Sequence, residues 1–152
     1  TVNYIIETLK FHVVFIPHIY SDIKAITKLL DLLEDSLIRN YITVAPCVQG
    51  FNGADNLFSV YQKSEFVIGS RFHANVCSLT LGKNTIGLLG LDRISYLFEY
   101  FGMKDSTIHL EKNFSAKLIA RMSKRNNIKS QLLQEKKIET IEFYKDFFDQ
   151  YL

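Results

Sequence analysis

An arginine and a histidine stand two residues apart, directly after an apolar run. The segment reads Gly69-Ser70-Arg71-Phe72-His73-Ala74 and follows the apolar residues 66–68. If a helix begins here, the N–H groups of its first turn are unpaired and attract an anion. Arg71 carries a planar fork that fits a phosphate or a carboxylate, and His73 exchanges a proton near neutral pH. These residue types therefore predict a site that binds an anionic substrate and transfers a proton.

The local charge pattern supports this hypothesis. We expect Ser70 to cap the helix, so that Arg71 and His73 fall in its first turn. When charged, two such side chains oppose the helix dipole by about 0.3–1 kcal/mol each, and a bound anion removes the conflict. The alternative is that Arg71 is a surface cation and His73 a packed ring. His18, which follows Pro17, faces either the same predicted site as Arg71 and His73 or solvent.

The elements that position these residues alternate between strand and helix. Apolar runs without period-two alternation indicate buried strands of a parallel sheet, and helical spacing of apolar residues fills the segments between them. The class is therefore α/β, a Rossmann-like three-layer sandwich with a parallel sheet and a long C-terminal helix, whose ligands bind beyond the carboxyl ends of the strands. The predicted strands are 12–16, 42–45, 66–69, 85–89 and 107–110. The predicted helices are 4–9, a helix from the Ser21-Asp22 cap through Leu37, 56–63, 71–81, a helix from the Asp92 cap to Gly102, and 116–152. The last of these is predicted to break at Asn126-Asn127.

Length and composition limit the possible functions. The 152 residues suffice for one domain, and a net charge of +2 gives no argument for nucleic acid. No cysteine or histidine pair has zinc spacing, and neither a dinucleotide nor a phosphate-loop motif is present, so we expect no metal and no cofactor. No apolar run is long enough to cross a membrane. The chain begins at Thr1 rather than Met, which suggests one domain of a longer two-domain protein.

The segment FVIGSRFHANVCSLTLGKNTIGLL resembles the signature of the polysaccharide pyruvyl transferases. Arg71, His73, Ala74 and Gly82 match it, and the spacing from Arg93 to Gly102 matches a downstream helix that the family opens with a basic residue. The segment VVFIPHIYSD is similar as well, so the resemblance runs from about residue 11 to 103. Asn84 and Gly90 depart from the pattern, at positions where the family usually has a proline and often a tyrosine.

The resemblance implies the C-terminal half of a GT-B-like fold and a defined chemistry. The family transfers the pyruvyl or enolpyruvyl unit of phosphoenolpyruvate to a sugar hydroxyl of a cell-surface or exopolysaccharide precursor. His73 would be the general acid, and Ser70, Arg71, Arg93 and His18 would bind substrate. Phosphoenolpyruvate is then a donor substrate rather than a cofactor, and the partner is a saccharide acceptor, free or lipid-linked. The implied location is the cytoplasm or the inner face of the membrane.

Two other functions stay open, together with two surface features. The chain is alternatively a GT-B glycosyltransferase half that binds a sugar nucleotide, or a non-catalytic domain that keeps the fold. Gln49, Asn52 and Asn56 are polar residues that could contact a sugar from the predicted loop 47–55 and its edge. The basic segment Lys117–Lys137 faces solvent or a membrane surface. The final helix carries an apolar stripe, listed as Ile141, Tyr144, Phe147, Phe148 and Tyr151, which predicts a core face or an interface with a second copy or a further domain.

Overall fold

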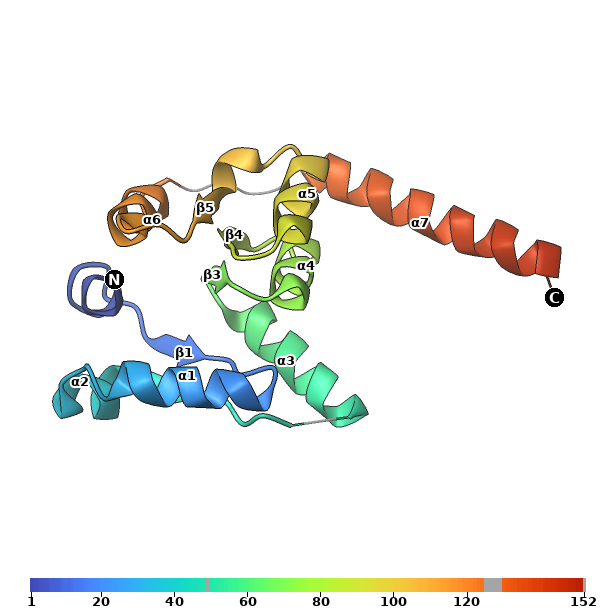
Figure 1. The fold of residues 1–152 in the computed structure, drawn as a ribbon. Coiled ribbons are helices and arrows are strands. Elements are labelled where there is room, and N and C mark those ends of the chain that lie inside the picture. Colours follow the sequence, from blue (N-terminus) through green and yellow to red (C-terminus); the bar gives the residue numbers. More distant parts are fainter. Residues whose placement is uncertain (49, 125–129, 152) are drawn as a thin grey trace. The chain divides into compact units, whose positions relative to one another are not determined.

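The computed structural model describes residues 1–48, 50–124 and 130–151. They group into two compact units, Thr1–Val60 and Tyr61–Leu152, and each is described by itself. Figure 1 follows the elements along the chain by colour. The fold is mixed α/β with parallel strands and a long C-terminal helix. It is consistent with a Rossmann-like layered fold, which confirms the predicted class.

The first unit is built around a parallel pair of short strands. In register, Val13 lies opposite Ile42 and Phe15 opposite Val44. A π-helical turn precedes the pair, and two helices connect its strands. The elements are η1 (Tyr4–Thr8), β1 (Val13–Phe15), α1 (Tyr20–Leu30), α2 (Asp35–Tyr41) and β2 (Ile42–Val44).

The single helix predicted through Leu37 is wrong, because the chain forms α1 and α2 instead. After α1, the amides of Leu32 and Leu33 donate to carbonyls three residues back, which tightens the backbone and ends the helix. One straight helix over residues 20–41 would be about 33 Å long, far beyond a three-residue strand of about 10 Å. Leu33 and Leu37 are still half-buried. The helical spacing of apolar residues therefore continues from α1 into α2, although the chain turns between the two helices so that it can return to β2.

Helix α3 (Phe51–Lys63) begins five residues earlier than the sequence indicates. Gly50 and Gly53 favoured a loop over residues 47–55, but Gly53 lies inside the helix and is buried. A Cβ at Gly53 would overlap the backbone of Val48. This glycine therefore serves close packing of two chain segments rather than a turn.

The second unit contains a three-stranded parallel sheet in the order β3-β4-β5. In register, Phe66 lies opposite Asn84 and Gly87 opposite Thr107. Helices α4 and α5 contact one another and strand β4 (Figure 1). The elements are β3 (Phe66–Gly69), α4 (Phe72–Thr80), β4 (Asn84–Leu89), α5 (Asp92–Tyr100), η2 (Lys104–Ser106), β5 (Thr107–His109), α6 (Phe114–Met122) and α7 (Ser130–Tyr151). The strands agree with the prediction to within two residues at each end.

A compact apolar core fixes the two helices next to the sheet. Its buried members are Leu79 from α4, Ile94 and Phe98 from α5, and Met103. Half-buried apolar side chains pack around it: Phe72, Leu89, Leu97, Phe101 and Leu133. Because both helices contribute buried side chains to one cluster, their first turns are held in a fixed relation.

Glycines end both helices with the same hydrogen-bond pattern. Gly82 has φ +68° and Gly102 has φ +64°. Behind α5, the Gly102 amide donates to the carbonyl of Glu99 and the Met103 amide to that of Phe98. The α4 end repeats this pattern at Gly82 and Lys83. Both ends are Schellman motifs, which confirms that the helices end where the sequence predicts.

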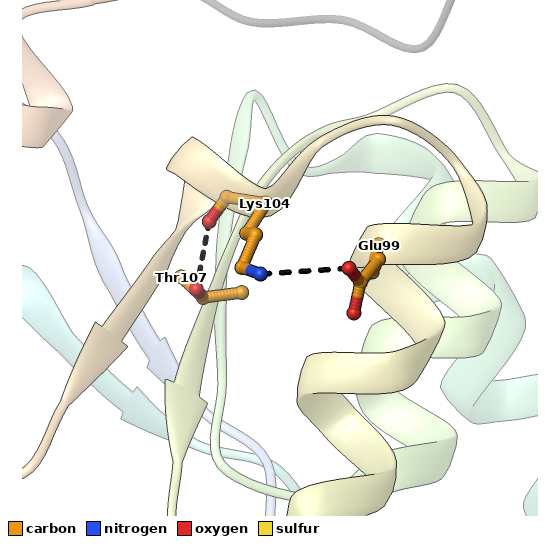
Figure 2. A network of polar contacts seen from close by, with 3 residues as sticks. All are labelled: Glu99, Lys104 and Thr107. Carbon is orange, nitrogen blue, oxygen red and sulfur yellow. Dashed lines mark hydrogen bonds and ion pairs between the residues drawn. The ribbon is translucent and has the colours of Figure 1, made fainter.

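A polar network joins the end of α5 to strand β5, as Figure 2 shows. Lys104 Nζ lies 3.4 Å from Glu99 Oε1, and the Thr107 hydroxyl donates to the Lys104 carbonyl at 2.8 Å. Further along, Arg121 of α6 donates to the carbonyl of Asp105 at 2.8 Å and to the Ser106 hydroxyl at 2.7 Å. The short helix η2 is therefore tied to elements on both sides of it.

The C-terminal segment is mostly helical as predicted, but α6 ends at Met122, and Ser123 and Lys124 lie in a turn. The break expected at Asn126-Asn127 lies outside the described residues. Helix α7 is anchored near its start, where Leu133 packs on the core and Lys136 Nζ lies 4.6 Å from the centre of the Tyr100 ring. None of the helices in the described part of the chain has the length and apolar character that crossing a membrane requires.

Candidate active site

Arg71 stands at the junction of strand β3 and helix α4. Its backbone is extended (φ −100°, ψ 141°), and its carbonyl accepts the Asn75 amide at 3.2 Å as the first helical hydrogen bond. Arg71 is therefore the N-cap, and the prediction that Ser70 caps this helix is wrong. Ser70 is exposed and lies one residue before the cap position. No side-chain hydrogen bond caps α4, so its first N–H groups are open to a ligand.

Asn75 fixes the loop that carries Arg71. Its side chain is fully buried, and Nδ2 donates to the Gly69 carbonyl at 3.0 Å and to the Arg71 carbonyl at 2.8 Å. A Cβ at Gly69 would lie 2.5 Å from Asn75 Oδ1, so only glycine fits there. Asn75 was not among the residues predicted for the site. The available signal was a polar residue at the fourth position after an arginine, next to apolar residues on both sides.

Phe72 connects the first turns of the two helices. Arg93, the second residue of α5, places its guanidinium carbon 5.1 Å from the centre of the Phe72 ring. The His73 imidazole meets the same ring edge-on, with centroids 5.8 Å apart and planes at 76°. Two predicted site residues, His73 and Arg93, therefore contact one ring at the starts of α4 and α5, and Arg71 directly precedes that ring in the chain.

Helix α5 also begins without a side-chain cap. Leu91 occupies the N-cap position with extended backbone, and Asp92 is the first helical residue. The prediction that Asp92 caps the helix is therefore wrong by one position. Its carboxylate still lies in the first turn, where it is favourable to the helix dipole.

The electrostatics of this region favour an anion. Arg71 is half-buried, whereas His73 and Arg93 are exposed. Two helix N-termini add N–H donors and partial positive charge to the two guanidinium groups, and the Asp92 carboxylate in the first turn of α5 offsets part of that charge. Exposed and half-buried groups remain accessible to a small molecule, so the arrangement can hold a ligand with two anionic groups next to a histidine that transfers a proton.

Two weak acids of the same unit, Tyr61 and Cys77, have pKa values raised above their ordinary range. Burial raises the pKa of the Tyr61 hydroxyl, and the charge on Cys77 raises it further. Burial likewise raises the pKa of the half-buried Cys77 thiol. A cysteine acts as a nucleophile through its thiolate, so the raised pKa makes Cys77 unreactive at neutral pH.

The remaining candidate residues lie on other elements of the chain. His18 belongs to the first unit, where its backbone amide donates to Asp22 Oδ2 at 3.0 Å. A role for His18 beside Arg71 stays a prediction. Asn52 and Asn56 lie on helix α3 rather than on a loop, and Asn56 is exposed. Gln49 lies outside the described residues.

Several cations of the basic segment have partners within the chain. Lys117 pairs with Glu111 at 3.0 Å, and Lys136 pairs with Glu139 at 2.6 Å. Arg121 donates to the Lys124 carbonyl at 3.0 Å. These contacts favour a solvated helix face over a patch that contacts a membrane. Across residues 1–48, 50–124 and 130–151, no group of three or more histidine, cysteine or acidic side chains is placed to hold a metal ion.

Comparison with known proteins gives one match. A family model described as polysaccharide pyruvyl transferase matches residues 1–90. The matched range includes Arg71 and His73 and ends three residues before Arg93. Neither the curated proteins nor the solved structures contain a significant match to the chain.

Proposed function

The chain belongs to the polysaccharide pyruvyl transferase family, and from this we propose that it transfers the pyruvyl or enolpyruvyl group of phosphoenolpyruvate to a hydroxyl of a saccharide. The acceptor is a precursor of a cell-surface or extracellular polysaccharide, free or carried on a lipid. The site is at the starts of α4 and α5, and the proposed location is the cytoplasm or the inner face of the membrane. In this proposal the chain is the C-terminal half of a GT-B-like arrangement.

The observation that carries the proposal is the contact of His73 and Arg93 with the Phe72 ring at two helix N-termini, directly after Arg71 at the N-cap of α4. Phosphoenolpyruvate has a phosphate and a carboxylate attached to the same carbon, and each needs cations or N–H donors. Arg71 and Arg93 each offer a fork for one of these groups, and the uncapped helix starts supply N–H donors. The donor therefore matches the charges of the site group by group.

The proposed chemistry assigns a proton transfer to His73. Its imidazolium donates a proton to the methylene carbon of the donor, which becomes a methyl group. The sugar hydroxyl bonds through its oxygen to the adjacent carbon and returns a proton to the His73 imidazole. The bond from that carbon to the phosphate oxygen then breaks, and inorganic phosphate leaves. A second hydroxyl of the same sugar bonds to the same carbon and closes a cyclic ketal, and its proton leaves with the phosphate. The arginines offset the negative charge that accumulates on the leaving phosphate.

Release of phosphate tests the proposal directly. We expect the intact protein to release inorganic phosphate from phosphoenolpyruvate only when a saccharide acceptor is present, with a matching gain in acceptor mass. The variant Arg71→Ala should lose this activity, and Lys63→Ala, an exposed cation at the end of α3, should keep it. Activity that survives the combined loss of Arg71 and His73 would contradict the assignment. Stabilisation by nucleotide sugars in place of phosphoenolpyruvate would support a glycosyltransferase.

A further inference from the structure

Phe72 contacts the apolar core, the Arg93 guanidinium and the His73 imidazole. It is the first helical residue of α4, between Arg71 and His73. Its side chain is half-buried and packs against the core of Leu79, Ile94, Phe98 and Met103. The ring is therefore held by the interior of the unit, although the residues on both sides of it face the proposed site.

The exposed surface of this ring contacts two functional groups at once. The Arg93 guanidinium carbon lies 5.1 Å from the ring centre, within the range of a cation–π interaction. The His73 ring lies 5.8 Å away at 76°, which is an edge-to-face arrangement. Arg93 and His73 come from different helices, and a single side chain contacts both.

The contact with Phe72 limits the conformations of the Arg93 and His73 side chains, which burial does not fix. Arg93 and His73 are exposed, and a long exposed arginine samples many rotamers. A ring anchored in the core reduces this freedom before any ligand arrives. Leucine would fill a similar volume without an aromatic face for the guanidinium or for the imidazole edge.

We infer that Phe72 is a positioning residue, whose core-anchored ring holds the Arg93 guanidinium and the His73 imidazole in one arrangement. The inference rests on the proposed function for its meaning, but its contacts are testable without any substrate. Phe72 itself touches no reacting atom. Its effect is to keep two exposed groups, from the starts of α4 and α5, at fixed positions relative to each other.

The test compares Phe72→Leu with Phe72→Tyr, which retains the ring, and with Phe101→Leu. Phe101 is the matched control, since it packs on the same core but contacts Tyr100 rather than the site. Two readouts use the intact protein without donor. One is the rate at which phenylglyoxal modifies Arg93, followed by peptide mass spectrometry. The other is the position of the His73 ring-proton resonances, which feel the ring current of Phe72.

We expect Phe72→Leu to raise the Arg93 modification rate about two- to fivefold, the value of a cation–π contact at an exposed site. The His73 resonances should move in the same variant, and Phe72→Tyr and Phe101→Leu should leave both readouts unchanged. If Phe72→Leu does not fold, Phe72→Met gives the same comparison. Unchanged readouts in the folded variant, or equal changes in Phe101→Leu, would overturn the inference.

A third readout separates this inference from the proposed function. The Phe72→Leu variant should bind phosphoenolpyruvate about two- to fivefold more weakly than the protein without a substitution does, and the Phe72→Tyr variant should bind it with the same affinity as that protein. If the unmodified protein does not bind phosphoenolpyruvate, the proposed function fails. The Arg93 and His73 readouts still decide the role of Phe72, because they need no donor.

Discussion

His73 is the side chain on which the proposed chemistry depends most directly. Because its imidazole is exposed, its removal should leave the fold intact. We predict that His73→Ala lowers kcat by about 10²–10⁴-fold, the usual contribution of a general acid, with little change in Tm. The control is His12→Ala, whose ring bonds to Thr43 in the first unit at 2.8 Å. Phosphate release checks the prediction, and a similar loss in both variants would contradict it.

Asn75 is the residue whose replacement should disturb the site loop most. In Asn75→Asp, a carboxylate oxygen replaces the amide that donates to the carbonyls of Gly69 and Arg71. Loss of buried donors costs about 1–3 kcal/mol each, so the free energy of unfolding should fall by at least that much. Asn56→Asp, on an exposed position of α3, should change it by less than about 0.5 kcal/mol. Equal urea midpoints for the two variants would refute this role.

Part of the candidate site can be predicted from the sequence, because the chemical groups of some side chains suggest a function on their own. Arg71 and His73 can be recognised in this way, since a guanidinium and an imidazole directly after a buried strand predict an anion-binding and proton-transfer site before any contact is known. The roles of Asn75 and Phe72 depend on partners at other places in the fold, namely two loop carbonyls and Arg93. Sequence spacing does not reveal those partners, so both residues resembled ordinary helix positions.

At the scale of elements, the glycines that end α4 and α5 make a clear prediction. A Cβ at Gly102 meets no atom within 4 Å, so Gly102→Ala tests backbone conformation alone. At φ +64°, alanine is strained by about 1–2 kcal/mol, and the free energy of unfolding should fall by that amount. Gly90→Ala is the control, because its Cβ would meet only Leu110 at an ordinary 3.7 Å. Thermal or urea unfolding measures both, and an equal loss would contradict the account.

Strand positions follow from the sequence better than helix starts. Apolar runs that end at Pro17 or Pro46 mark strands to within two residues. Helix starts were placed one or two residues late for α1 and α5, and one residue early for α4, because side-chain caps were expected. The N-cap positions are held by Ile19, Arg71 and Leu91, none of which makes a side-chain cap hydrogen bond. At α1 the Asp22 carboxylate, inside the first turn, accepts the backbone amides of His18 and Ile19, whereas at α4 and α5 the usual cap residues give no signal.

For the whole molecule, the buried acids predict a loss of stability at alkaline pH. The pKa of the Tyr61 hydroxyl is raised above its ordinary 10.0, and that of the Cys77 thiol above its ordinary 9.0. The unfolded chain therefore releases these protons first as the pH rises. The stability that both groups contribute is complete below about pH 9 and is lost as the pH approaches their folded pKa values.

Tyr61→Phe should weaken this dependence. The variant removes the more deeply buried of the two acids, so its free energy of unfolding should decrease less between about pH 9 and about pH 11 than that of the protein without the substitution. Tyr96→Phe is the control, since Tyr96 is 68% exposed on α5. Urea unfolding at several pH values measures the slopes. An identical slope for Tyr61→Phe and the unmodified protein would contradict the prediction.

The apolar face of α7 is an exposed surface rather than part of the core. Its members are 46–54% exposed, namely Ile141, Tyr144, Phe147 and Phe148. Tyr144 and Phe148 stack on one another, with ring centres 6.4 Å apart. The sequence predicted either a core or an interface, and the structure excludes the core within the described residues. Association through this face, with a second copy or a further domain, stays a prediction.

The measurement that tests the central claim most directly is calorimetric titration of the intact protein with phosphoenolpyruvate. The account predicts binding, and a loss of affinity in Arg71→Gln of about 10- to 150-fold, which corresponds to one charged hydrogen-bonded contact. Lys63→Gln should bind as the unmodified protein does. Absence of binding to the unmodified protein, or equal affinity in Arg71→Gln, would contradict the claim that the starts of α4 and α5 form the donor site.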